Sequence, residues 1–570
     1  MMVENRSIDV DFTNEKQHEV RVKEGEKLIA KEWFPKKFWT KPREWKRFTS
    51  FVLVYKELDL KEFENLKIKL DAEYQDKIQQ IKSSQGKEII YDYESEAIDI
   101  KELIQEIEKE FPHMWQPTEV CLSIIHTILL EDLSDPMSIN LVGSPSSEKT
   151  TILGFFYGLD EIIFRTDSFS PKSFVSHANL PKEQLEGVDL LPKIKNKCIV
   201  IPELAPIFGK RKEDLIENLS VITRVFDGEG YESDSGVHGH RGYHGEYLFS
   251  WLGATTPLSN HVWQTMGKLG NRFMFYDIPP KNKNIEELKS IMQNNDSYKI
   301  KREKCKNLIH NFVKTSFSKY KKPLQLKWNK SSDDSQAIEL IALLAKLLVR
   351  LRATVDIFEV KDNEGNNHYS YSVPLIEEPE RAITMLYNIA RGRALIYSRE
   401  HINLEDIPLI FKVVISSCPY ERSKVIQIYF KRKTKFLNTS QISTDLNCSI
   451  QHAKRIMKQF EILGIIKQEE LRIESGNIGR PENRYTLVNN LQNLLTQTIE
   501  ILEKYDFDKY SVWCRNDVQN EAKVDSEPKN TDFEPKNDIT QSDVSIDSNI
   551  KSPPHTVSEI QIEDVKNEPE

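Results

Sequence analysis

A pattern typical of phosphate binding surrounds Lys149. It lies between two short apolar runs and consists of Gly143, Ser144, Pro145, Ser146, Ser147, Glu148, Lys149, Thr150 and Thr151. This order predicts a strand, a tight turn and a helix whose backbone N–H groups would bind the phosphates of ATP. Lys149 would reach the β- and γ-phosphates, and the Thr150 hydroxyl would be a ligand of Mg²⁺.

Glu148 departs from the usual pattern, which has glycine at this position. Its carboxylate would lie beside a triphosphate of like charge, and at low dielectric this repulsion costs about a kcal/mol or more. If the side chain turns outward to a lysine, the site survives. If it does not, the domain is a scaffold that no longer uses nucleotide.

Three polar residues downstream occur at positions suited to hydrolysis of a phosphate bond. Glu203 follows an apolar run and could orient the attacking water, but Pro202 occupies the place of the aspartate that usually supports Mg²⁺. Thr256 ends another apolar run, where a hydroxyl could contact the γ-phosphate. Arg272 precedes a last apolar run, where a cation could reach a neighbouring subunit.

Apolar runs alternate with helical or loop segments between Pro117 and Pro280. The candidate strands are 138–142, 161–166, 197–202, 247–254 and 272–278, after an apolar helix at 117–130. Such alternation predicts an α/β fold with a mostly parallel sheet. Phosphate sites of these sheets lie at the carboxyl ends of the strands, which is where the Lys149 segment falls.

Residues 117–417 resemble the AAA+ module of the minichromosome maintenance helicases and their magnesium-chelatase relatives. The similar segments are INLVGSPSSEKTTIL, KCIVIPELAP, LGATTPL, GNRFMFYDIP, IELIALLAKLLVRLRA and PERAITMLYNIARGRALIYSREHINLEDI. That family often has alanine in place of the second glycine of the phosphate loop, so Glu148 falls at a relaxed position. The resemblance implies a helical lid, ATP and Mg²⁺ bound between subunits, and a homo-hexamer.

The resemblance also assigns roles to single residues. It makes Glu203 the Walker B glutamate and places Thr256 at the sensor 1 position, where the family has asparagine. It makes Arg272 the arginine finger that acts across a subunit interface and Arg381 the sensor 2 arginine. Arg391 and Arg393 on the same helix are rival lid arginines, and surface salt bridges are the simpler interpretation of both.

The segment 420–505 has the order expected of a winged helix-turn-helix: a short helix at 440–446, a turn, a longer helix at 450–463, and a hairpin. Basic residues exceed acidic ones between Lys431 and Tyr485. The candidate DNA-binding residues are Lys454, Arg455 and Lys458 on the second helix and Arg480 and Arg484 on the wing. Winged helices also dock on proteins, so both interpretations stay open.

Two further clusters have alternative interpretations. Between Lys31 and Phe48, seven basic residues alternate with six aromatic ones, which suits either a nucleic-acid surface or an aromatic core below a solvated face. His238, His240 and His244 lie in a glycine-rich segment. They suit a metal site poorly because no cysteine is near, and a mobile insert that touches DNA, together with Arg241, is the favoured interpretation.

Composition bounds the remaining possibilities. The 570 residues, 39% of them apolar, suffice for several domains. The tail 516–570 has 14 acidic residues and five lysines, so its net charge of −9 equals that of the whole chain. It is expected to be disordered, and either keeps the protein soluble or mimics nucleic acid. Six scattered cysteines and the lack of a long apolar run favour a cytoplasmic protein outside the membrane.

These observations predict five regions: 1–110, an α+β region that is a candidate for nucleic-acid binding; 111–280, the P-loop AAA+ core; 281–417, the lid with an insertion; 420–505, the winged helix; and 510–570, the acidic tail. The expected function is an ATP-dependent motor on DNA, a helicase or translocase that hydrolyses ATP at subunit interfaces. The alternative is a DNA-binding regulator or recruiter whose degenerate phosphate loop does not hydrolyse nucleotide.

Overall fold

The structure is a computed structural model that describes residues 6–11, 17–24, 27–35, 38–56, 58–85, 89–93, 97–176, 186–235, 239–279, 285–293, 295–361, 367–471 and 482–505. None of the helices in these ranges is both long enough and apolar enough to cross a membrane. The acidic tail predicted at 510–570 lies outside the described residues.

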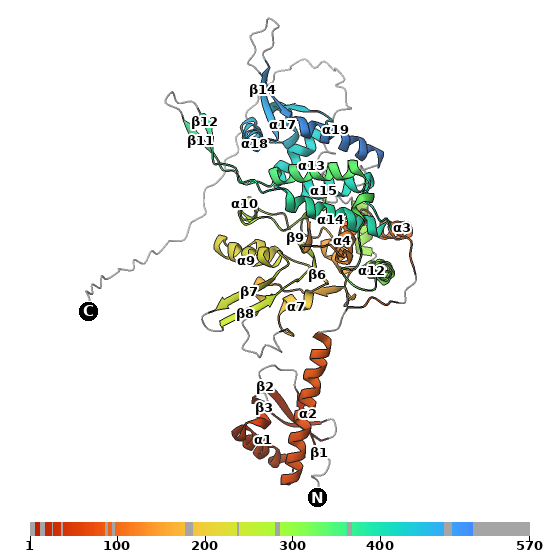
Figure 1. The fold of residues 1–570 in the computed structure, drawn as a ribbon, viewed down its shortest axis with the longest axis vertical. Helices are drawn as coiled ribbons and strands as arrows, with labels where there is room; N and C mark the ends of the chain where they lie inside the picture. The colour runs from red at the N-terminus through yellow and green to blue at the C-terminus, as the bar shows by residue number, and fades with distance from the viewer. Residues whose placement is uncertain are drawn as a thin grey trace, which may run out of the picture. The chain divides into compact units, whose positions relative to one another are not determined.

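A five-stranded parallel sheet forms the centre of the fold (Figure 1). Its strands are β4 (Met137–Val142), β5 (Ile163–Arg165), β6 (Cys198–Ile201), β9 (Ser250–Thr255) and β10 (Phe275–Asp277). The expected α/β class and all five predicted strands are therefore confirmed. Their spatial order is β10-β4-β9-β6-β5, so β9 lies between β4 and β6 although it follows both in the chain.

Both faces of the sheet are covered, because alternate side chains of each strand enter different apolar clusters. Ile139 and Leu141 of β4 pack on the side of α4 (Trp115–His126). Trp251 of β9 packs on the other side. Helices α7 (Leu190–Ile194), α8 (Ala205–Phe208), α9 (Lys212–Val225) and α10 (Asn260–Leu269) belong to that second side.

The region predicted as a lid contains three helices, α13 (Ser335–Leu351), α14 (Glu380–Ile396) and α15 (Ile407–Ser416), with the hairpin β11 (Ile357–Lys361) and β12 (Asn367–Tyr371). The N-cap of α13 is Asp334, whose side chain accepts a hydrogen bond from the Ala337 N–H at 2.9 Å. Helix α14 packs closely on α4 because Gly392 has no side chain: a Cβ there would lie 2.0 Å from the Ser123 carbonyl oxygen.

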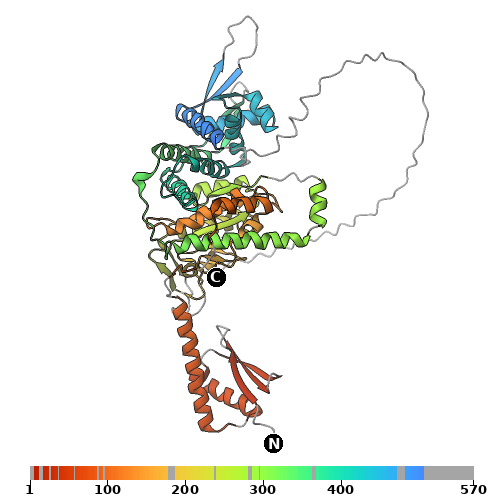
Figure 2. The same ribbon diagram turned by 90° about the vertical axis from the view of Figure 1, so that its right-hand side faces the viewer.

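Two helices outside the predicted core region pack on it. The long helix α12 (Asn295–Ser318) lies against α3 (Ile100–Glu110) (Figure 2). Lys304 of α12 forms an ion pair of 2.6 Å with Glu106 of α3. Helix α3 also contacts α4. The predicted regions place α3 in 1–110 and α12 in 281–417, and these boundaries remain predictions.

The N-terminal domain has its own core. It contains an antiparallel sheet and two helices: β1 (Arg6–Asp11), β2 (Gln17–Glu24), β3 (Lys27–Pro35), α1 (Pro42–Tyr55) and α2 (Leu60–Gln85). Phe34, Phe38, Trp39 and Phe48 are buried there. Most aromatic residues of the 31–48 segment thus form a core rather than a stacking surface, and Trp33 is the exposed exception, at 42%.

The C-terminal domain follows the predicted order of elements. Its members are α16 (Tyr420–Lys431), β13 (Phe436–Asn438), α17 (Thr439–Leu446), α18 (Ile450–Ile462), β14 (Ile466–Leu471), β15 (Glu482–Leu487) and α19 (Asn489–Lys504). Asn438 and Gln441 form a capping box at the start of α17, and Asn447 ends it in the left-handed conformation, at φ 49°. These local signals fix the tight turn before α18.

Further short elements complete these bodies. They are α5 (Lys149–Gly154), β7 (Gly230–Ser235), β8 (Gly239–His244), α11 (Ile285–Gln293) and the short 3₁₀ helices η1 (Phe38–Thr40), η2 (Thr127–Leu129), η3 (Pro171–Ser173), η4 (Lys330–Ser332) and η5 (Leu404–Asp406).

His126, at the end of α4, is expected to make the fold sensitive to acid. Burial lowers its pKa to about 4 from an ordinary 6.5, and its ring nitrogens contact the Leu122 carbonyl and the Ser316 hydroxyl, each at 2.8 Å. Between these two pH values the unfolded chain binds the proton and the folded chain does not. This contribution to stability is complete above pH 6.5 and is lost as the pH falls to 4, a loss of about 3 kcal/mol.

The measurement is the free energy of unfolding from denaturant titrations between pH 4 and pH 7. The variant His126→Gln should show a smaller slope across this range than the wild type. Equal slopes would contradict a neutral buried imidazole.

Candidate nucleotide-binding site

The segments after β4, β6 and β9 meet at the carboxyl edge of the sheet. The N–H of Gly143 donates to the Thr255 carbonyl at 3.3 Å, and the N–H of Leu204 donates to the Ala254 carbonyl at 2.8 Å. The end of β9 therefore fixes both the predicted phosphate loop and the turn that contains Glu203. The structure brings together three segments of the chain, of which the first and the last, at Gly143 and Thr255, lie more than 100 residues apart.

Glu148 adopts the left-handed conformation for which glycine is usually required, with φ 67° and ψ 9°. Its carbonyl oxygen accepts from the N–H groups of Thr151 and Ile152, at 3.0 and 3.1 Å, so this residue begins helix α5. The left-handed conformation costs a residue with a Cβ roughly 1–2 kcal/mol. The loop therefore keeps the backbone conformation expected with glycine at this position, and Glu148 is strained as a result.

Lys149 lies inside the predicted phosphate loop. Its ammonium group donates to the carbonyl oxygens of Gly143 and Ser144, at 2.7 and 2.8 Å, and to the Ser147 hydroxyl at 3.0 Å. The residue is 7% exposed. Burial lowers the pKa of Lys149, and the nearby Glu203 carboxylate opposes that shift. Three loop oxygens thus hold the cation at the centre of the turn.

The rest of the loop is narrow and partly open to solvent. A Cβ at Gly143 would lie 2.5 Å from the Ser147 hydroxyl oxygen, so glycine is needed for the loop to close on itself. Ser144, Pro145, Ser146 and Thr150 are exposed. The Thr151 hydroxyl is 2.6 Å from the Tyr298 hydroxyl of α12. No motif in the sequence pointed to Tyr298, because it lies in a polar segment 147 residues away.

Glu203 and Thr256 both lie at this edge. Glu203 is exposed, and its Oε1 accepts from the Ala205 N–H at 2.9 Å, which directs the carboxylate back over the start of α8. Thr256 is half-buried directly after β9. An exposed carboxylate, a hydroxyl and a buried lysine are thus available around one turn.

Arg272 and Arg381 do not join this group. The Arg272 carbonyl accepts from the Ser138 hydroxyl at the start of β4, which places Arg272 at the amino edge of the sheet. A Cβ at Gly270 would lie 3.1 Å from Nη1 of Arg272 and 3.6 Å from Nη1 of Arg381, so the two guanidinium groups are neighbours. Arg272 also forms an ion pair of 2.8 Å with Asp227.

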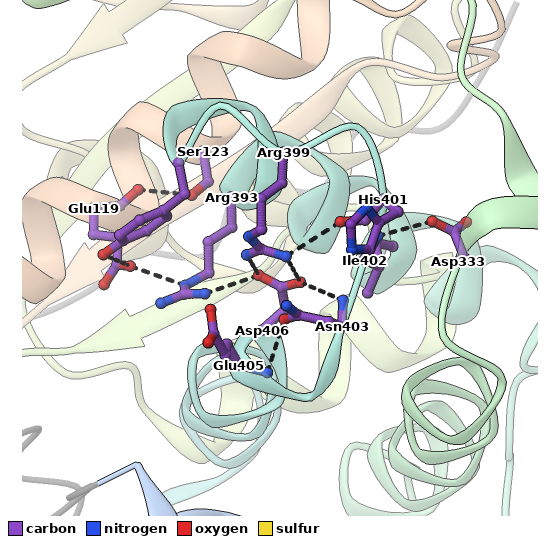
Figure 3. A network of polar contacts seen from close by, with 11 residues as sticks. Glu119, Ser123, Asp333, Arg393, Arg399, His401, Ile402, Asn403, Glu405 and Asp406 are labelled. Atoms are coloured by element: carbon purple, nitrogen blue, oxygen red, sulfur yellow. Dashed lines mark hydrogen bonds and ion pairs between the residues drawn. The ribbon is translucent and has the colours of Figure 1, made fainter. Parts of the chain in front are cut away.

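The rival lid arginines are buried, which corrects the expectation of surface salt bridges. Arg391 pairs with Asp132 at 2.6 Å. Arg393 donates to Glu119 on α4 at 2.9 Å and to Asp406 at 2.8 Å (Figure 3). Burial alone would lower the Arg393 pKa, but the two carboxylates raise it above its ordinary value. Both arginines hold α14 in place and are not available to a ligand.

The histidine segment includes the antiparallel hairpin β7–β8, and its proposed contact with DNA remains a prediction. His240 contacts Asp234 at 3.0 Å, and His244 contacts Glu232 at 3.3 Å. His238 lies outside the described residues. Among the described residues, no three histidine, cysteine or carboxylate side chains are placed to hold a metal ion. Arg241 donates to the Ser176 carbonyl at 3.3 Å, which fixes its position on the hairpin.

The candidate DNA-binding residues differ in their surroundings. Lys454 and Arg455 are exposed on α18. Lys458 forms an ion pair of 2.8 Å with Glu461 on the same helix. The Arg484 guanidinium lies over the Phe436 ring, 3.5 Å from its centre. Arg480 lies outside the described residues, and contact with DNA remains a prediction for all five.

The comparisons with known proteins assign no family to the chain: neither a scan against protein-family models nor a search of curated proteins finds a match. Any function proposed for the chain therefore rests on the geometry of its site.

Glycine at position 148 is expected to stabilise the protein relative to alanine. Both Glu148→Gly and Glu148→Ala remove the charge, but only glycine relieves the left-handed backbone, by about 1 kcal/mol. Glu217, an exposed residue within α9, gives the reverse order, since glycine in a helix costs about 1 kcal/mol relative to alanine. Thermal or chemical unfolding of the four variants tests this. The same order at both positions would exclude backbone strain at Glu148.

Removing the charge of Asp406 is expected to destabilise the protein by about 3–5 kcal/mol, because Asp406→Asn leaves buried Arg393 and half-buried Arg399 with less compensating charge. The matched control is Asp445→Asn, which breaks a partly exposed pair with Arg432 and should cost about 1 kcal/mol or less. Chemical denaturation measures both. Equal losses would show that the Asp406 network adds no more than a surface pair.

Proposed function

We propose that this protein is a Mg²⁺-dependent ATPase of the P-loop class whose C-terminal domain binds DNA, and that it acts on DNA as an oligomeric motor. The observation that carries the proposal is the meeting of Lys149, Glu203 and Thr256 at the carboxyl edge of one parallel sheet. Ligands of open α/β sheets bind at that edge, beyond the ends of the strands.

The loop fits a polyphosphate. Its backbone turns at Glu148 into helix α5, and the amides before that helix are the groups that bind anions. On nucleotide binding, Lys149 would exchange its three loop oxygens for phosphate oxygens. Thr150 is exposed at the start of α5 and is the residue that would hold Mg²⁺, whose charge would offset that of the phosphates.

Two groups would act on the reaction. Glu203 is exposed and close enough to Lys149 to affect its pKa, which supports the proposal that it would orient a water molecule. Thr256 would donate its hydroxyl hydrogen to a phosphate oxygen. Arg272 and Arg381 lie at the other edge of the sheet, and in this proposal they serve the loop of a neighbouring copy.

The second candidate is a DNA-binding regulator that does not hydrolyse nucleotide. The strained Glu148 and the proline at position 202 favour it, since both depart from the residues that hydrolysis normally uses. In that case the loop would serve assembly, and the C-terminal domain would carry the activity.

ATP turnover in the presence of duplex and single-stranded DNA tests the proposal. Lys149→Ala should weaken nucleotide binding at least tenfold. Glu203→Gln should keep binding but lower turnover about 100-fold or more, because only the positioned water is lost. Lys210→Ala, a change of an exposed lysine in the loop before α9, is the matched control and should leave both unchanged.

The two candidates give different results. Absence of ATP turnover by the wild type on either DNA, with nucleotide binding retained, would overturn the motor and favour the regulator. Turnover that survives Glu203→Gln would overturn the assigned role of Glu203.

A further inference from the structure

A polar cavity lies away from the phosphate loop, among α10, the end of α13, strand β11, α16 and α18. Its volume is about 440 Å³, many times the roughly 30 Å³ that one water molecule occupies in the liquid. Arg352, Arg422 and Arg455 line it from three different elements, together with Thr354, Asn260 and Gln264. The sequence analysis gave no role to Arg352 or Arg422.

Arg352 is the innermost of these residues. Its side chain is 1% exposed, and Nε donates to Glu377. Nη1 and Nη2 are buried and donate no hydrogen bond to the described chain, and the buried Thr354 hydroxyl is likewise unpartnered. Buried donors without acceptors cost free energy, and native proteins rarely keep several of them in one place without a ligand or water.

The arginines of the cavity keep unused hydrogen-bonding capacity, although three carboxylates, Glu377, Asp356 and Glu421, lie at or beside it. Burial lowers the pKa of Arg422 to about 10, and its Nη1 donates to the carbonyls of Leu351 and Ala353 rather than to a carboxylate. Burial and the nearby Arg272 lower the pKa of Arg352, although Glu377 opposes this. Two carboxylates also line the cavity, Asp356 and Glu421, but Glu421 is engaged by His452 at 3.1 Å.

We propose that this cavity is a binding site for a phosphate group, held by Arg352, Arg422 and Arg455. Guanidinium groups match phosphate oxygens in pairs, and here they approach from separate elements. A tetrahedral anion offers oxygens in all these directions, whereas a carboxylate offers two in one plane. Arg455 is exposed on α18, so the phosphate belongs either to a DNA strand or to a free phosphate compound.

The first experiment uses the full chain with Lys149→Ala, so that phosphate bound at the loop cannot contribute. Inorganic phosphate should raise the midpoint of thermal unfolding more than chloride at equal ionic strength. Arg455→Gln should increase the phosphate concentration for a half-maximal rise about tenfold or more, the loss of one charge-assisted hydrogen bond. Lys346→Gln, a change of an exposed cation on α13 that does not line the cavity, should leave that concentration unchanged.

Arg352→Gln gives a second test from inside the cavity, because it should also increase the phosphate concentration for a half-maximal rise. If Arg352→Gln does not fold, Arg455→Gln still tests the proposal. No phosphate-specific rise, or an equal rise with Arg455→Gln, would overturn the site. Because Lys149 is absent throughout, neither result depends on the proposed ATPase.

Competition separates the two sources of phosphate. If the site holds the DNA backbone, inorganic phosphate should displace a duplex oligonucleotide more strongly than chloride at equal ionic strength, and Arg455→Gln should abolish the difference. If phosphate binds without this competition, the ligand is a free phosphate compound. Both results support the site, and each identifies the source of the bound phosphate.

Discussion

The hydrogen bonds at the end of β9 fix the turns that follow β4 and β6 at the carboxyl edge of the sheet. Because β9 lies between β4 and β6, its last carbonyls accept from both neighbouring turns. Gly253 makes this possible, since a Cβ there would lie 2.1 Å from the Asn140 side-chain oxygen. The distance between Lys149 and Glu203 is therefore set by the sheet itself rather than by flexible loops.

Charge is used in two opposite ways in this protein. Arg393 lies between two carboxylates, so its charge is compensated and it fastens α14 to α4. Arg352 is equally enclosed and pairs with Glu377, but its two Nη groups donate no hydrogen bond within the described residues. The first arrangement stabilises a joint, and the second is the basis of the proposed phosphate site.

The strands of the central sheet and helices α4, α17 and α18 could be predicted because each apolar run had a clear length and clear ends. Their order could not, since β9 and β6 are equally apolar and only packing decides which of them lies next to β4. The hairpin β7–β8 and helix α12 escaped prediction because they are polar and weakly periodic. The burial of Arg393 was also missed, since a charged residue in a helix is usually exposed.

The candidate site was predictable in part. Spacing alone located Lys149, Glu203 and Thr256, and the structure brings them to one edge. Spacing could not show that Glu148 takes a left-handed backbone, that Tyr298 contacts Thr151, or that Arg272 is paired with Asp227. Each of these depends on a residue that is distant in sequence or on a dihedral angle that several residue types can adopt.

Lys149 and Arg272 lie at opposite edges of the same sheet, and this separation limits how copies of the chain can cooperate. A twofold interface uses the same patch on both copies, so it could join the loop of each copy to Arg272 of the other only if both groups lay on one patch, which opposite edges of the sheet do not allow. Under the proposed function the contact must be head to tail, and only a closed ring leaves no loop unserved. Each catalytic site would then combine residues of two neighbouring chains. The number of active sites in an assembly would therefore equal the number of complete interfaces rather than the number of intact subunits.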